Sequence, residues 1–207
     1  MMVSFSTVKN NNGSESNMNS INNKSKTDNT TNNTLNSRIL VAYFSRADEN
    51  YSVENIEKGN TEIVAEMFQS ELDSDIYKIE TTYSYPADYT ECIEVAKSEQ
   101  ATSKRPKLKN KLDSISNYDY IYLGYPIWWS DMPMVVYTFL ESFNFKDKKI
   151  VPFCTHEGSG LTSTVNNIKD TCKEATVLKG LAIIGSKAQN NREETRKIVK
   201  EFISNVE

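Results

Sequence analysis

The run Ile-Leu-Val-Ala-Tyr-Phe at residues 39–44 decides the fold class of this chain. A short, nearly continuous apolar run is typical of a strand that is buried on both faces of a parallel sheet. Similar runs recur along the sequence, separated by longer stretches with apolar residues at helical spacing. Because parallel strands are joined by crossover helices, this alternation predicts an α/β fold, a three-layer sandwich with a five-stranded parallel sheet.

The predicted elements are five strands and five helices in alternation. The strands are expected at residues 39–44, 76–79, 120–124, 149–154 and 177–184. The helices are expected at residues 60–72, 89–100, 134–143, 161–172 and 192–206. Within the third helix, the helical spacing places Tyr137, Phe139 and Phe143 in the core.

Residues 1–37 differ in composition from the rest of the chain. They contain 11 Asn, 7 Ser and 5 Thr and few apolar residues. Such a segment cannot bury enough apolar surface to offset the entropy lost on ordering. We therefore predict a disordered Asn/Ser/Thr-rich tail at residues 1–37 and one folded domain at residues 38–207. The tail lacks the continuous apolar stretch of a secretory signal, so no export is expected.

Composition argues against several classes of partner. The chain has a net charge of −4, and because residues 1–37 carry one net positive charge, residues 38–207 carry −5. Binding to nucleic acid or to anionic membranes requires a basic face, and no apolar run approaches the roughly 20 residues of a membrane-spanning helix. Three cysteines without C-x-x-C spacing and a single histidine are too few for a zinc site. A reducing, cytoplasmic compartment fits this composition best.

Ligands of an open parallel sheet bind beyond the carboxyl ends of its strands. The first strand is followed by Ser45 and Arg46, and residues 58–61 read Lys-Gly-Asn-Thr at the start of the first helix. Unpaired N–H groups and the positive end of the helix dipole attract anions there. Because motifs for nucleoside triphosphates and dinucleotides are absent, Ser45, Asn60 and Thr61 predict a cradle for a phosphate monoester. The alternative is that Asn60 and Thr61 are ordinary helix caps.

The loop after the third strand carries both tryptophans of the chain. Residues 124–133 read Gly-Tyr-Pro-Ile-Trp-Trp-Ser-Asp-Met-Pro. Loops over a sheet edge are normally polar, so this loop requires a partner that covers its rings. A flat aromatic ligand fits, because stacking on Trp or Tyr adds ~0.5–1.5 kcal/mol beyond burial. The alternative is that one Trp packs into the core or forms a dimer interface.

The loop after the fourth strand, residues 155–160, reads Thr-His-Glu-Gly-Ser-Gly. Its glycines allow close backbone approach and positive φ, and its hydroxyls can bind a polar ring edge. The residues of this loop expected to contact a ligand are Thr155, Glu157, Gly158, Ser159 and Gly160. His156 is a candidate catalytic residue because imidazole titrates near neutrality. The alternatives are a hydrogen bond of His156 within its own loop and a solvated Glu157.

Taken together, these segments resemble the flavodoxin-like family, most closely its branch with an insertion in the phosphate loop. The matching segments are Val41–Arg46, Gly59–Glu62, Gly124–Trp129 and Thr155–Gly160. The resemblance implies the strand order 2-1-3-4-5 and bound FMN. The cofactor phosphate is then expected at Ser45, Arg46, Asn60 and Thr61, and its ring at Tyr125, Pro126, Ile127, Trp128 and the 155–160 loop. The chain departs from short flavodoxins because residues 47–58 interrupt the phosphate loop.

The resemblance implies a redox function in which FMN does the electron chemistry. Two functions are possible for such a protein: electron transfer to a redox partner protein, and NAD(P)H-dependent reduction of small acceptors such as quinones. Single-electron carriers commonly use a peptide flip beside the flavin, which Pro126 and its bulky neighbours are expected to resist because they disfavour positive φ. This hypothesis favours two-electron chemistry. The alternative outside enzymology is a cofactor-free interaction module with the same fold.

Overall fold

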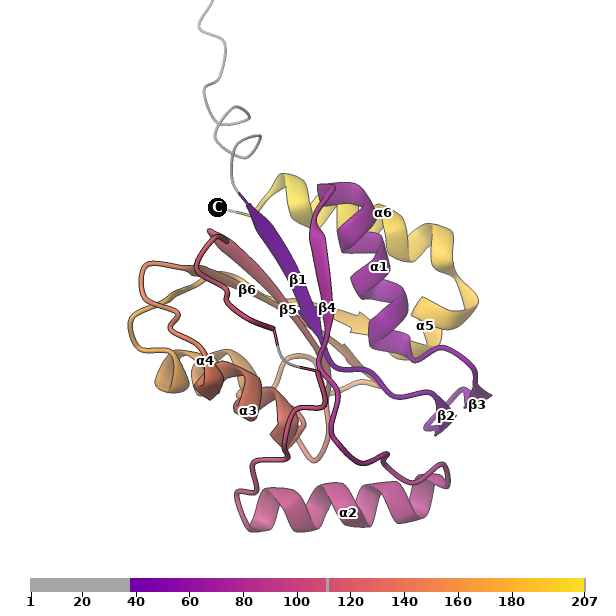
Figure 1. Ribbon diagram of the computed structural model, residues 1–207. Coiled ribbons are helices and arrows are strands. Elements are labelled where there is room, and N and C mark those ends of the chain that lie inside the picture. The colour runs from indigo at the N-terminus through magenta and orange to yellow at the C-terminus, as the bar shows by residue number, and fades with distance from the viewer. Residues whose placement is uncertain (1–37, 111, 207) are drawn as a thin grey trace, which may run out of the picture.

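The computed structural model describes residues 38–110 and 112–206, so the predicted tail at residues 1–37 lies outside the described residues. Within this range, helices cover both faces of a central sheet (Figure 1). The strands of the sheet are β1 (Ile39–Tyr43), β4 (Asp75–Lys78), β5 (Tyr120–Pro126), β6 (Lys149–His156), β7 (Thr176–Val177) and β8 (Leu181–Ile184). The helices are α1 (Asn60–Leu72), α2 (Tyr89–Ala101), α3 (Met134–Ser142), α4 (Thr164–Thr171), α5 (Gly185–Asn190) and α6 (Arg192–Ser204).

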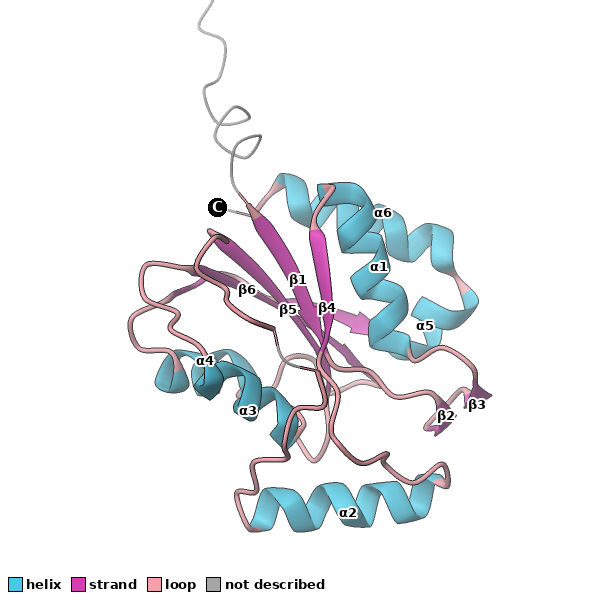
Figure 2. Ribbon diagram, viewed as in Figure 1, coloured by secondary structure: helices cyan, strands magenta, loops and turns pink. Residues whose placement is uncertain are grey.

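The sheet is parallel, and its strand order is β4-β1-β5-β6, with β7 and β8 both paired to β6. Numbered as the five predicted strands, this is the order 2-1-3-4-5, so the prediction is confirmed. β1 is central, with Val41 opposite Ile76 of β4 and Tyr122 of β5. Helices α1 and α6 lie on one face and α3 and α4 on the other (Figure 2). All five residues of β1 are therefore buried.

Alternate residues of β1 enter two hydrophobic cores, one on each face of the sheet. Leu40 and Ala42 belong to the core under α3 and α4, and the other three residues to the core under α1 and α6. This alternation follows from the period of two along a strand. Phe139 of α3 is fully buried in the first core, as predicted. Tyr137 and Phe143 pack at the edge of the same core.

The predicted strand at residues 177–184 is wrong as a single element. Val177 of β7 pairs with Ile150, and Leu181 of β8 pairs with Phe153, so three residues of the last strand face two of β6. Pro152 lies at this interruption and has no N–H to donate to a neighbouring strand. The extra residue divides the edge of the sheet into two short strands, β7 and β8.

Two helix predictions also need correction. The helix expected at residues 161–172 begins only at Thr164, because Thr162 has a positive φ of 52° that a right-handed helix does not accept. Residues 185–190, expected as a connection, form the short helix α5. The other four helices match the predicted elements, with ends that differ by a few residues.

The insertion at residues 47–58 contains a small hairpin that the sequence did not predict. β2 (Asp48–Asn50) pairs in antiparallel fashion with β3 (Glu54–Ile56) and lies apart from the main sheet (Figure 1). The two strands are short and exposed for most of their length. The hairpin therefore extends beyond the carboxyl end of β1 rather than adding to the core.

Helix α2 is not one of the helices that cover the faces of the sheet. It lies beyond the carboxyl ends of the strands (Figure 1). The connection that follows it packs Leu108 and Ile115 against the core under α3 and α4 instead. Cys92 and Ala96 are the buried apolar residues of α2, and both face the pocket described below.

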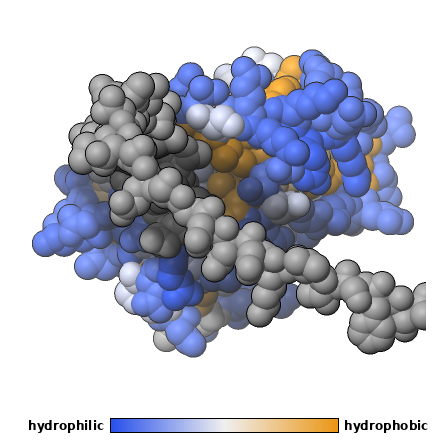
Figure 3. All heavy atoms as spheres, turned by 90° about the horizontal axis from the view of Figure 1, so that it is seen from above, coloured by the Kyte–Doolittle hydropathy of each residue, from blue (hydrophilic) through white to orange (hydrophobic). Residues whose placement is uncertain are grey.

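Figure 3 views the molecule from above, toward the amino end of the sheet. Hydrophilic residues cover most of the visible described surface, and hydrophobic residues show in a band near its centre. Among the helices that the structure describes, none combines the length and apolar character needed to cross a membrane.

Candidate functional site

A pocket of about 280 Å³ lies beyond the carboxyl ends of β1, β5 and β6. Typical ligand pockets measure ~300–1,000 Å³, so its volume is near the lower end of that range. The structure brings the three predicted loops together around it. The lining residues from these loops are Arg46, Asn60, Pro126, Ile127, Trp128, Trp129, Thr155, His156 and Glu157. The remaining lining residues come from the hairpin and α2 and are Asn50, Tyr51, Tyr89, Cys92, Ile93 and Ala96.

One end of the pocket is the amino terminus of α1. Its N-cap residue, Gly59, provides no side-chain cap, and a Cβ at this position would overlap the Ser45 hydroxyl and the Arg46 carbonyl. Among the described residues, the N–H groups of Asn60 and Thr61 have no hydrogen-bond acceptor. The Asn60 side-chain oxygen is buried and also lacks a partner. Since buried polar groups are normally paired, this end of the pocket is built for a polar ligand.

Ser45 and Thr61 lie directly behind this surface. The Ser45 hydroxyl accepts a hydrogen bond of 3.1 Å from the backbone N–H of Glu62. The buried hydroxyls of Thr61 and Thr155 are 2.7 Å apart. These contacts hold the start of α1 against the ends of β1 and β6. Ser45 and Thr61 therefore hold the helix terminus in place. A ligand that bound their hydroxyls would have to replace these existing hydrogen bonds.

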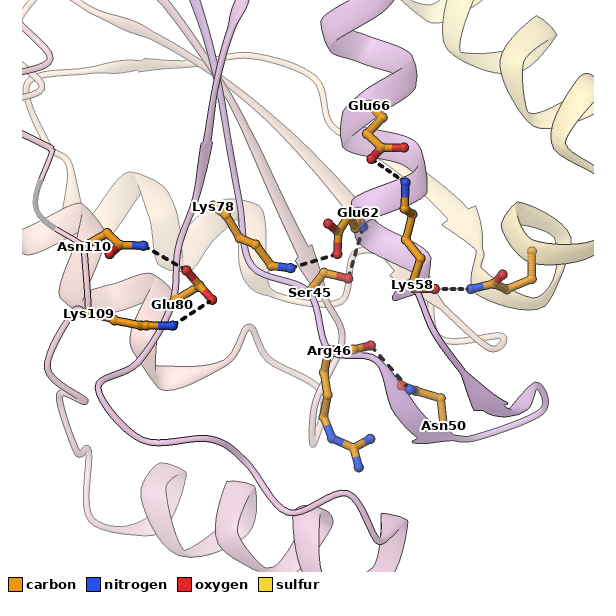
Figure 4. A network of polar contacts seen from close by, with 11 residues as sticks. Ser45, Arg46, Asn50, Lys58, Glu62, Glu66, Lys78, Glu80, Lys109 and Asn110 are labelled. Carbon is orange, nitrogen blue, oxygen red and sulfur yellow. Dashed lines mark hydrogen bonds and ion pairs between the residues drawn. The ribbon is translucent and has the colours of Figure 1, made fainter.

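Two carboxylates lie close to the helix terminus, and each has its own partners. Glu62 forms a 2.9 Å ion pair with Lys78 of β4, and Figure 4 shows the two side chains pointing toward one another. Glu157 accepts hydrogen bonds from the backbone N–H and the hydroxyl of Ser186, at 2.6 and 2.9 Å. With both acids engaged, the free N–H groups fit a phosphate group, whereas the unpaired Asn60 side-chain oxygen fits a hydrogen-bond donor.

The side chain of Arg46 is not directed to the predicted phosphate site. Its guanidinium points away from α1 in Figure 4 and donates to the carbonyls of Glu49, Pro86 and Ala87. The Pro86 contact measures 3.1 Å from Nε. A guanidinium has five N–H donors in a fixed plane, so it can join several carbonyls at once. In this structure, Arg46 joins the hairpin to the segment before α2, although it also lines the pocket.

Trp128 forms the aromatic wall of the pocket, and its ring is held on two sides. It makes edge-to-face contacts with Phe44 and Tyr85, with ring centroids 5.3 and 5.1 Å apart. The neighbouring Ile127 N–H donates to the Thr155 carbonyl at 2.9 Å, which ties the second loop to the third. The predicted ligand contact of Tyr125 is not supported for its side chain. Tyr125 ends in the core, is fully buried and donates to Thr164.

Residues 128–131 form a tight turn, with reciprocal backbone hydrogen bonds of 2.8 and 3.0 Å between Trp128 and Asp131. Trp129 and Ser130 at its centre have positive φ values of 49° and 62°. None of residues 125–128 has a positive φ, so these two residues lie just beyond the Pro126 segment that is expected to resist it. Contacts with α2 stabilise the unusual conformation, because Trp129 Nε1 donates to the Ile93 carbonyl at 2.9 Å.

The third loop is stabilised from within by His156. Its Nδ1 accepts hydrogen bonds from the N–H groups of Gly158 and Gly160, at 2.9 and 3.0 Å. Burial lowers the pKa of His156, so the neutral ring is favoured. Gly158 and Gly160 adopt positive φ, as predicted, but with Ser159 they are not among the pocket-lining residues. His156 lines the pocket, yet the alternative of a hydrogen bond within its own loop describes its contacts.

Seven lining residues are not among the predicted site residues: Trp129, next to the predicted Trp128, and the six from the hairpin and α2. Those of α2 carry a signal, because Tyr89, Cys92, Ile93 and Ala96 recur at helical spacing and form one face. The same spacing also fits a helix packed on the sheet, so it does not by itself indicate a pocket wall. Burial raises the pKa of the Cys92 thiol, so this lining thiol stays protonated. The hairpin residue Tyr51 has no such signal, because it lies in the turn between two three-residue strands that are too short to show a period.

Comparison with known proteins places this site in a family. Flavodoxin is the family that matches, over residues 38–203. Solved structures similar to this chain include two proteins assigned as flavoproteins. The one from Bacteroides uniformis has 29% identity and a TM-score of 0.66 and covers 82% of this chain and 99% of that chain. The one from Bacteroides eggerthii has 28% identity and a TM-score of 0.66, with 82% and 97% covered.

A more distant similarity concerns a Lactobacillus acidophilus flavoprotein solved in complex with FMN. It has 21% identity and a TM-score of 0.55 and covers 76% of this chain and 99% of that chain. No curated protein matches the chain significantly. The family match at residues 38–203 includes every element that lines the pocket. The chain therefore belongs to the flavodoxin family, and its cofactor is FMN.

Proposed function

We propose that this chain binds FMN in the described pocket and uses it to reduce small acceptors such as quinones, with NAD(P)H as the reductant. One observation carries the proposal. The pocket joins a helix terminus with unpaired N–H groups, at Asn60 and Thr61, to an aromatic wall at Trp128. A phosphate ester of a planar ring system matches both ends of the pocket, because its phosphate fits the helix terminus and its ring fits the aromatic wall.

The residues of the pocket divide between these two parts. The phosphate would be held by the N–H groups of Asn60 and Thr61, with the side-chain NH2 of Asn60 as a further donor. The ring would lie against Ile127 and Trp128, with Thr155 at its polar edge. FMN supplies the electron chemistry when bound, and the protein orients it and excludes water. Asp131 and the 128–131 turn hold the aromatic wall in place from behind.

The position of α2 favours small acceptors over a protein partner. Tyr89 and Ile93 of α2 and Tyr51 of the hairpin form the outer wall of the pocket. A redox partner protein needs broad access to the flavin edge, whereas a small molecule needs only the opening between these elements. Transfer of electrons to a partner protein is the second candidate function. The three free cysteines, all buried, support the proposed cytoplasmic location.

A visible spectrum of the purified chain after incubation with FMN and removal of free ligand tests cofactor binding. We expect a yellow protein and quenched tryptophan fluorescence, because both tryptophans line the pocket. Stopped-flow mixing with NADH or NADPH then separates the two candidate functions. Rapid bleaching of the flavin supports the reductase, and slow bleaching supports the carrier. A folded chain that stays colourless supports a cofactor-free interaction module instead.

The Trp128→Ala variant tests the assignment of the aromatic wall. Loss of stacking should weaken FMN binding about fivefold to tenfold. Tyr137→Ala is the matched control, because Tyr137 contacts the same turn through Asp131 but does not line the pocket. FMN titrations of the two folded variants compare them directly. If Trp128→Ala bound FMN as tightly as the unmodified chain, the proposal that Trp128 stacks on the FMN ring would be refuted.

A further inference from the structure

The outer wall of the pocket is not used by the FMN contacts described above. We propose that its two tyrosines, Tyr51 and Tyr89, bind the electron acceptor, and that the acceptor is a planar, uncharged aromatic compound such as a quinone. This inference rests on the proposed function, because the acceptor has to meet FMN inside the pocket. It assigns a substrate class to the pocket and a specificity role to a hairpin absent from short flavodoxins.

The geometry of the two rings supports an aromatic ligand. Tyr51 lies at the turn of the hairpin with 63% of its surface exposed, and Tyr89 is the first residue of α2. Their ring centroids are 6.2 Å apart with an interplanar angle of 32°, and both line the pocket. Neither phenol forms a hydrogen bond among the described residues. Each hydroxyl is therefore free to donate to the carbonyl oxygen of a quinone.

This wall is a built structure, because the hairpin and α2 are joined at several points. The Glu49 N–H donates to the Ala87 carbonyl at 3.3 Å, and the Tyr89 N–H donates to the Glu49 carboxylate at 3.1 Å. The Arg46 guanidinium donates to the Pro86 carbonyl from the other side. An exposed tyrosine on an otherwise free loop would lose more entropy on binding a ligand. Here Tyr51 is carried by an element already fixed to α2.

The charge around the tyrosines selects among aromatic acceptors. Glu49, Asp88 and Glu91 are exposed and lie within two residues of Tyr51 or Tyr89 in the chain. Of the cations near the pocket, Arg46 already donates to backbone carbonyls and Lys97 lies over the Trp129 ring, 5.2 Å from its centroid. An anionic acceptor would be repelled by these carboxylates, whereas a neutral quinone would not.

The reaction balances with the proposed reductant. NAD(P)H and a proton reduce FMN by two electrons, and the oxidised nicotinamide leaves. The neutral quinone then gains two electrons and two protons from the reduced cofactor and becomes a hydroquinone, while FMN returns to its oxidised form. The tyrosines bind and orient the quinone and are not themselves oxidised.

The test uses the full chain loaded with FMN and reduced by stoichiometric dithionite without oxygen, so that it does not depend on the identity of the reductant. Menadione is the neutral probe, and a sulfonated naphthoquinone is the anionic probe. Stopped-flow absorbance gives the rate of flavin reoxidation against quinone concentration. Variants Tyr51→Ala, Tyr51→Phe and Tyr89→Ala are compared with Asn55→Ala, an exposed hairpin residue outside the pocket lining.

We expect Tyr51→Ala and Tyr89→Ala to raise the half-saturating menadione concentration about fivefold, with FMN affinity changed less than twofold. Tyr51→Phe should fall between them and the unmodified chain, and Asn55→Ala should match the unmodified chain. The sulfonated quinone should require a higher concentration than menadione. An unchanged menadione dependence in both alanine variants overturns the inference. A loss of FMN affinity as large as the rise in the half-saturating menadione concentration also overturns it. A chain that binds no FMN overturns the proposed function together with it.

Discussion

Helices α1 and α2 both begin beside the pocket, but their first turns differ in which N–H groups are paired. In each helix the third N–H donates to a side-chain oxygen, from Glu91 to Asp88 at 2.8 Å and from Glu62 to Ser45 at 3.1 Å. The first N–H differs, because Tyr89 donates to the Glu49 carboxylate, whereas Asn60 has no acceptor among the described residues. The Asn60 side-chain oxygen is also buried and unpaired. The comparison indicates that α1 leaves part of its terminus for a ligand, whereas the backbone at the start of α2 is paired within the protein.

The 155–160 loop follows the pattern of α2 rather than that of α1. The N–H groups of Gly158 and Gly160 both donate to His156 Nδ1 within the same loop. A loop with satisfied donors has less to offer an anion than a helix terminus with open ones. The phosphate is therefore expected at α1, and this loop is expected to contribute mainly shape.

The largest effect is expected for Gly59→Ala. The new Cβ would overlap the Ser45 hydroxyl and the Arg46 carbonyl, so the start of α1 has to move. Loss of two hydrogen bonds to a charged phosphate should weaken FMN binding on the order of 100-fold. Fluorescence titration of the folded variant with FMN and with riboflavin measures this. Riboflavin lacks the phosphate and should be affected less, and an equal loss for both ligands would contradict an open terminus.

Asn60→Asp is expected to have a smaller effect, with opposite signs for stability and binding. The substitution keeps the shape and adds a negative charge at the helix terminus. Without ligand, the charge should stabilise α1 by ~0.3–1 kcal/mol. With FMN, repulsion of the phosphate should reduce affinity about tenfold or more. Urea unfolding and FMN titration of the same preparation test both signs. A variant that binds FMN as tightly as the unmodified chain would remove Asn60 from the phosphate site.

Asp88→Ala removes the cap of α2 and should lower the free energy of unfolding by ~1 kcal/mol. FMN affinity should change less than twofold, because the Asp88 carboxylate bonds only within its own helix turn. Urea unfolding gives the first quantity and fluorescence titration the second. A loss of affinity comparable to that of Asn60→Asp would show that the two helix starts are not functionally different.

The smallest effect is expected at His156 and depends on pH. Because the folded state lowers the pKa of His156, the unfolded chain binds a proton more readily. The stabilisation from the neutral ring is therefore fully present above the ordinary pKa of 6.5 and declines as the pH falls below it. Asn at this position keeps an acceptor but does not titrate. His156→Asn should remove this pH dependence, with a change below about 1 kcal/mol because the loop is partly exposed.

A proton NMR titration checks this directly, since His156 is the single histidine of the chain. Its signal should titrate below 6.5 in the folded chain. A pKa at or above the ordinary value would contradict the hydrogen-bonded Nδ1. It would then return His156 to the group of candidate proton donors.

Local sequence pattern was enough to predict most of the fold. β1 and β6 are apolar along nearly their whole length because both of their faces are buried, and runs of this length are too short for most helices. The strand order was predicted from the resemblance to the flavodoxin-like family, and the crossover rule adds only the handedness of the connections. The edge of the sheet was less predictable. β7 and β8 are short, and their division depends on the neighbouring Pro152 of another strand.

The sequence predicted which loops meet at the site, because the direction of the strands fixes the edge where those loops lie. It did not predict where individual side chains in those loops point. The strand-end rule placed Asn60, Trp128 and Thr155 at one edge, and the structure brings them to one pocket. Tyr125 points to the core because alternation along β5 continues one residue further than expected. Arg46 donates to backbone carbonyls more than 35 residues away in the chain. A local sequence pattern cannot predict such a contact.

By itself, the sequence pattern determined the α/β class and the edge at which the pocket opens, because the burial of a central strand acts locally along the chain. The strand order was predicted from the resemblance to the flavodoxin-like family. Tertiary structure alone decided that α2 crosses this edge, that the hairpin is joined to it through Arg46 and Glu49, and that Trp129 accepts a positive φ. Each of these depends on contacts between segments far apart in sequence. Such contacts outweigh local preferences only when the whole chain is folded.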